Sequence, residues 1–141
     1  MQRIISLLQE KNHYLEKFYS LNETEILNFS MGNFENLENF YNTRERILEI
    51  IRYLDGQLEQ ENSETHDFSG MSIEDRRQVV ESMRTKDEYV SRIIEQDLEV
   101  LACIEAAKSN IIRELQDVRR ARKAVGGYKS PTFNKRLDEE V

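Results

Sequence analysis

The stretch from Ile73 to Val125 contains neither glycine nor proline, and this feature most limits what the chain can fold into. Gly and Pro are the residues that most strongly interrupt helices, so 53 consecutive residues without them favour one long helical segment. Apolar residues recur through it at spacings of three and four, as on one face of a helix. They are Ile73, Val80, Met83, Val90, Ile94, Leu101, Ile104, Ile111, Leu115, Val118 and Val125.

Two features refine this prediction. Ser72, followed three residues later by Asp75, resembles a capping box and predicts the start of the segment. Residues 84–88 (RTKDE) include no apolar side chain, so two alternatives stay open. Either the helix is continuous, or it bends or breaks near Lys86 and gives a short third helix and a longer fourth one.

The first 60 residues predict a helical hairpin. Before Gly32 the apolar residues keep helical spacing, less cleanly from Asn22 onward. Gly32 suits the left-handed position after a helix, and Asn33 can cap a second helix that runs to about Leu58. The polar stretch 61–70 (ENSETHDFSG) then reads as a loop.

These elements predict an all-α fold, in which an antiparallel helical hairpin packs with a long C-terminal helix. The result is a three- to four-helix bundle with coiled-coil-like patterning. Residues 1–126 are expected to form the bundle domain, and residues 127–141, after Gly126 and Gly127, a flexible tail. The expected core contains Leu8, Leu15, Phe18, Leu37, Leu48, Ile51 and Val80.

Composition and motifs argue against several functions. The formal charge of −7 disfavours a general nucleic-acid binder, and the basic end of the long helix is typical of a helix C-terminus. Glu10 and His13 have metal-ligand spacing but no second copy, and Cys103 has no partner cysteine. We therefore expect no enzyme, cofactor or metal site. No apolar run could span a membrane and no signal peptide is evident, so we expect a cytoplasmic protein without membrane insertion.

Length suggests a binding surface. The long segment would measure roughly 80 Å as one helix, whereas each hairpin helix is on the order of 40 Å. Part of its apolar seam should then face water, which usually marks an interaction site. The residues expected there are Leu101, Ile104, Ile111, Leu115 and Val118, and a partner helix or a second copy of the chain (a homodimer) would cover them.

Three segments together resemble a known family. They are the turn Gly32–Glu35, the helix RERILEIIRYL at 44–54 and the closing segment DLEVLACIEAAKSNIIRELQDVRRARKAVGGYKS at 97–130. This pattern resembles the small bacterial flagellar export chaperones of the FlgN and FliT type. The resemblance implies a cytosolic, non-enzymatic chaperone that holds the helical terminal segment of a flagellar axial protein, at the hook-filament junction or cap, before type III export.

The same resemblance implies roles for particular residues. The closing helix from Val90 to Val118, including Ile94, would hold the client, and Tyr128 would contact the export apparatus. The charged extension after Tyr128 departs from the family pattern. The alternative is a generic helical coiled-coil adaptor or scaffold protein, and a metal-binding bundle or enzyme ranks third.

Overall fold

A computed structural model describes residues 1–64 and 70–126, and within these ranges it contains three α-helices and no strand. They are α1 (Gln2–Ser30), α2 (Leu37–Glu64) and α3 (Ile73–Gly126). The predicted all-α class is therefore confirmed. The chain divides into two compact units, Met1–Leu101 and Ala102–Val141, here called unit 1 and unit 2. The predicted boundary after residue 126 stays a prediction.

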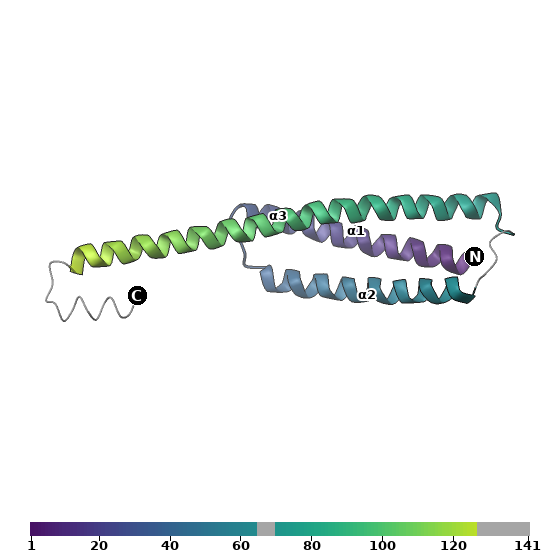
Figure 1. Ribbon diagram of the computed structural model, residues 1–141, viewed down its shortest axis with the longest axis horizontal. Helices are drawn as coiled ribbons and strands as arrows, with labels where there is room; N and C mark the ends of the chain where they lie inside the picture. Colours follow the sequence, from purple (N-terminus) through teal and green to yellow (C-terminus); the bar gives the residue numbers. More distant parts are fainter. Residues whose placement is uncertain (65–69, 127–141) are drawn as a thin grey trace. The chain divides into compact units, whose positions relative to one another are not determined.

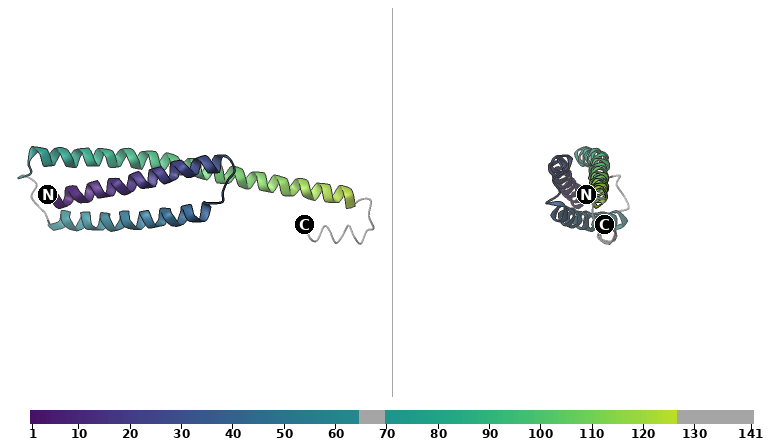
Figure 2. Two further views of the ribbon diagram at one scale, coloured as in Figure 1. Left: turned by 180° about the vertical axis from the view of Figure 1, so that it is seen from behind. Right: turned by 90° about the vertical axis from the view of Figure 1, so that its left-hand side faces the viewer.

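Unit 1 is a bundle of three helices. α1 and α2 form the antiparallel hairpin, and residues 73–101 of α3 lie alongside it (Figure 1). Seen along the bundle, the three helices occupy the corners of a triangle (Figure 2). In unit 2, the described residues 102–126 are the C-terminal part of α3, and nearly all of their side chains are exposed.

The turn after α1 forms as the sequence predicts. Gly32 has a φ of 80°, a left-handed conformation that glycine adopts without a steric penalty. The Gly32 N–H donates to the Phe29 carbonyl, and the Asn33 N–H donates to the Asn28 carbonyl, which is the Schellman pattern. Asn33 differs from the prediction: its side chain accepts from the Glu35 N–H in a local turn, and α2 begins only at Leu37.

The start and continuity of α3 are also resolved. The Ser72 hydroxyl oxygen accepts a hydrogen bond from the Asp75 N–H at 3.1 Å, so the predicted cap is confirmed. The helix runs through Lys86 without a break, because residues 84–88 lack apolar side chains but contain no helix breaker. α2 also extends to Glu64, further than expected, and the rest of the predicted loop through Ser69 lies outside the described residues.

The core of unit 1 lies between the three helices. Its central cluster consists of Leu15, Phe18, Ile47 and Ile51, with Tyr89 and Ile93 of α3 packed against it. Of the predicted core residues, Leu8, Leu15, Phe18 and Ile51 are buried, whereas Leu37 and Leu48 are half-buried. The prediction for Val80 was wrong, since its side chain is 50% exposed.

Candidate protein-binding surface

The face of α3 that packs against α1 and α2 in unit 1 is only partly apolar. We call it the inner seam. Its members follow the three-and-four spacing of a coiled-coil seam and are all buried or half-buried. They are Val79, Ser82, Lys86, Tyr89, Ile93, Gln96 and Val100.

Hydrogen bonds join two residues of the inner seam to α1, Gln96 through its side chain and Ser82 through its backbone carbonyl. Gln96, which is 3% exposed, accepts from the Asn22 amide at 3.1 Å. Its own amide nitrogen donates to the Tyr19 carbonyl and to Glu23. Ser82 contributes its carbonyl, which accepts from the Asn12 amide at 2.9 Å. Burial of the Gln96 amide costs little because both of its polar atoms are paired, whereas Oδ1 of Asn12 and Oδ1 of Asn22 are buried without a hydrogen-bond partner among the described residues.

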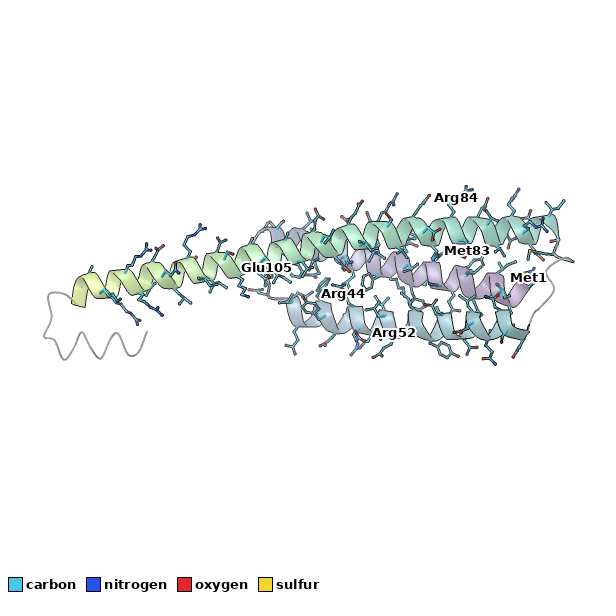
Figure 3. The ribbon with its side chains drawn as sticks, viewed as in Figure 1. Met1, Arg44, Arg52, Met83, Arg84 and Glu105 are labelled. Carbon is cyan, nitrogen blue, oxygen red and sulfur yellow. The ribbon has the colours of Figure 1, made fainter. Side chains whose placement is uncertain are left out.

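Arg44 of α2 joins the core to α3. Its guanidinium lies 4.8 Å from the ring centre of Phe18 and 5.1 Å from that of Phe40, in cation–π geometry. The same group forms an ion pair with Asp97 of α3 at 2.9 Å (Figure 3 labels Arg44). Asp97 thus has a defined position at the edge of the helix, and its side chain is still 41% exposed.

A second row of apolar residues on α3 faces solvent. We call its part in unit 1 the first stripe and its part in unit 2 the second stripe. Isoleucine, leucine and valine predominate in both, unlike in the inner seam. The first stripe is Val80, Met83, Val90, Ile94, Leu98 and Leu101, and the second is Ile104, Ile111, Ile112, Leu115, Val118 and Val125.

The residues predicted to bind a partner belong to these two stripes. Six of them are exposed: Val90, Ile94, Leu101, Ile111, Leu115 and Val118. Ile104 is half-buried. The structure therefore leaves six of the seven predicted residues accessible to a partner, three in each unit. Tyr128, predicted to dock on the export apparatus, lies outside the described residues, as do Phe133 and Leu137 of the tail.

The first stripe contains a groove of about 710 Å³. The residues that line it are all on α3, between Val79 and Arg92. Met83 lies in it, and it also lines a smaller internal cleft of about 250 Å³ between the three helices (Figure 3). Arg84, labelled in the same figure, points away from α1 and α2, and the groove is lined by two acidic side chains, Asp87 and Glu88, and two basic ones, Arg84 and Arg92.

Sequence reasoning missed part of this surface. Val80 was expected in the core and Leu98 was not assigned to any face, although both belong to the first stripe. The signal was present, because Val79 and Val80 start two seams with the same spacing one residue apart. Pattern alone does not decide which seam packs inside, and Val80 was the member of the outer seam expected there.

The other candidate sites gain no support from the structure. Within residues 1–64 and 70–126, no group of three or more His, Cys, Asp or Glu side chains could hold a metal ion. Cys103 is half-buried on α3. Among the described helices, none is both long and apolar enough to cross a membrane.

Comparisons with known proteins add no relative. A scan against family models, a search of curated proteins and a search of solved structures each found no significant match to this chain. The surface on α3 is therefore interpreted from its own geometry.

Proposed function

We propose that the protein is a chaperone that covers an amphipathic helix of a client protein with the exposed stripes of α3. The observation that carries this proposal is the placement of isoleucine, leucine and valine outside, on a helix whose inner seam is partly polar. A helix normally buries its more apolar face, and large exposed apolar rows usually mark an interaction site.

The resemblance to the FlgN and FliT type gives this proposal its specific form. The client is the helical terminal segment of a flagellar axial protein, held in the cytoplasm before type III export. Such a segment becomes part of a coiled coil after assembly, so its apolar stripe needs cover beforehand. Binding of this kind requires no cofactor and no nucleotide, because burial of apolar area supplies the free energy.

The binding step follows helix-in-groove recognition. An incoming helix would place apolar side chains, one turn apart, against the first stripe and into its groove between Val79 and Arg92. Each well-buried aliphatic anchor contributes about 1.5 to 3 kcal/mol to such a contact. Micromolar affinity corresponds to about 8 kcal/mol, and association itself costs about 4 kcal/mol or more, so a client helix needs at least about four such anchors.

The experiment measures binding of a fluorescent peptide that carries the terminal helical segment of an axial protein from the same genome. We expect Ile94→Asp and Ile111→Asp each to weaken binding by about tenfold or more, with helicity retained in circular dichroism. Tyr53→Asp is the matched control, since Tyr53 is 65% exposed but lies on α2. Equal loss in the control, or no binding by the parent protein, would overturn the proposal.

Tyr128 provides a separate test of the export step. On the proposed function, Tyr128→Ala leaves peptide affinity unchanged and reduces delivery of the client to the export apparatus. Delivery is measured as client secreted per cell in a strain that depends on this protein. The adaptor or scaffold alternative predicts instead that the stripes bind helices of non-flagellar proteins and that secretion is unaffected.

A further inference from the structure

The two stripes lie among side chains of opposite net charge. Residues 73–101 of α3 include eight acidic and five basic side chains, a net charge of −3. Residues 102–126 include three acidic and six basic side chains, a net charge of +3. Glu88 and Glu95 are exposed beside the first stripe, and Arg113 and Arg122 are exposed within or near the second. The same chain thus has one apolar stripe in a segment with net negative charge and another in a segment with net positive charge.

The stripes also share one continuous heptad register along the sequence of α3. Positions 80, 87, 94, 101, 108, 115 and 122 form one row, and positions 83, 90, 97, 104, 111, 118 and 125 form the other. This is the a and d pattern of a coiled-coil helix, which requires a facing helix to fill it. The pattern is interrupted by charge at Asp87, Asp97, Lys108 and Arg122.

We propose that a second copy of this chain is the facing helix, with the two α3 helices antiparallel. The first stripe of each copy then packs against the second stripe of the other, and two-fold symmetry forms the contact twice. Charge decides the direction. Antiparallel pairing brings the acidic residues 73–101 onto the basic residues 102–126, whereas parallel pairing would place like charge on like charge.

The charged positions also select one register. When Leu101 faces Ile104 of the second copy, Ile94 faces Ile111 and Val90 faces Leu115. In this register Asp97 faces Lys108, so the two central charges pair with each other. Asp97 holds Arg44 through Oδ1 and is still 41% exposed, and Lys108 is exposed, so both can take part.

Other registers are less favourable. A shift of one heptad in one direction places Lys108 against Ile104 and Asp97 against Leu115. A shift in the other direction places Lys108 against Val90 and Asp97 against Leu101. In the selected register Asp87 and Arg122 face apolar side chains, Val118 and Met83, but Asp97 and Lys108 are paired; either shift leaves Asp97 and Lys108 without a partner at their layers as well, which is costly.

The groove in the first stripe fits this pairing. In the selected register, Leu115 and Val118 of the second copy lie opposite Val90 and Asp87, within the length of α3 that lines the groove. Arg122 of the second copy lies one helical turn from Asp87. The aliphatic side chains would fill the groove, and Arg122 would approach Asp87 on its wall. Self-association requires no client, so the inference extends beyond the proposed function, and a client helix would compete with the second copy for the same stripes.

The test uses the Ile94–Ile111 contact, because both side chains are 57% exposed and substitution there leaves the core intact. The mass of the full chain is measured by light scattering or sedimentation across a concentration series. The parent protein should form a dimer of twice 16.8 kDa. Ile94→Lys alone and Ile111→Glu alone should each weaken dimerisation about a hundredfold, since each change removes two anchors per dimer.

Mixing the variants tests direction and register. Ile94→Lys mixed with Ile111→Glu should restore a dimer, because one contact becomes Lys against Glu and the other keeps both isoleucines. Ile94→Lys mixed with Ile94→Glu is the control and should stay monomeric, since residue 94 of one copy does not face residue 94 of the other. A monomeric parent protein, a dimer unaffected by either variant, or rescue in the control mixture would each overturn the proposal. Peptide binding by the monomeric variants is read separately and reports on the proposed function.

Discussion

The inner seam and the first stripe run along the same helix, one residue apart, and they differ in an unexpected direction. The inner seam, packed against α1 and α2, contains Ser82, Lys86 and Gln96. The first stripe faces solvent, and its row is apolar except at Asp87 and Asp97. Burial within unit 1 therefore does not explain why the more apolar of the two rows on α3 lies outside. The proposed function assigns this surface to a partner helix.

Two neighbouring residues give the most direct test of the difference between the inner seam and the first stripe. Val100 is 3% exposed on the inner seam, and Leu101 is 57% exposed on the first stripe. We expect Val100→Asp to lower the free energy of unfolding by about 3 to 5 kcal/mol, because it buries a charge without a partner. Leu101→Asp should change it by less than about 1 kcal/mol. Urea unfolding at low protein concentration measures both, and equal losses would show that both faces of α3 are packed.

The polar contact in the inner seam gives the next largest effect. Gln96→Leu should cost about 1 to 3 kcal/mol, because it leaves the Asn22 amide buried without its acceptor. Replacing both residues with Leu should recover most of that loss or stabilise the bundle, since no unpaired polar group remains. A double-mutant cycle in urea unfolding measures the coupling. Additive effects would mean that the two side chains do not act as a pair.

Arg44 tests the contact at the edge between the inner seam and the solvent-facing side of α3. Arg44→Lys keeps the positive charge beside Asp97 but removes the planar group that lies over Phe18 and Phe40. We expect a loss of about 1 kcal/mol in the free energy of unfolding. Arg46→Lys is the control on an exposed position of α2 and should be neutral. A neutral Arg44→Lys would show that the charge alone matters.

The sequence predicted the features that depend on nearby residues and did not predict one that depends on tertiary packing. The turn at Gly32 and the cap at Ser72 depend on residues within one or two helical turns, so local patterns sufficed. The choice between Val79 and Val80 depends on tertiary packing. The exposure of Val80 was not predicted because both seams have coiled-coil spacing and the polar side chain of Gln96 on the inner one is paired with Asn22 of α1.

Partner binding by Val90, Ile94 and Leu101 stays a prediction, and the structure shows that all three side chains are exposed. Leu101 was expected there because α3 is longer than its neighbours, whereas Val90 and Ile94 were implied by the family resemblance. The sequence pattern did not indicate that the exposed row also continues toward the start of α3. It could not assign Val80 and Leu98 to the same surface, since that assignment requires knowing how α3 is rotated about its axis against α1 and α2.

The smallest expected effect concerns Arg84, which is exposed beside the first stripe. In the antiparallel register proposed above, Arg84 lies opposite Ala121 of the second copy, and Arg119 and Arg122 on either side of Ala121 bring like charge close to it. Arg84→Glu should therefore strengthen dimerisation about two- to fivefold at low salt, and the gain should shrink as salt is raised. Arg46→Glu makes the same change of charge on α2 and serves as the control. A weaker dimer after Arg84→Glu would contradict the register, because a second copy shifted or reversed places Arg84 beside other side chains.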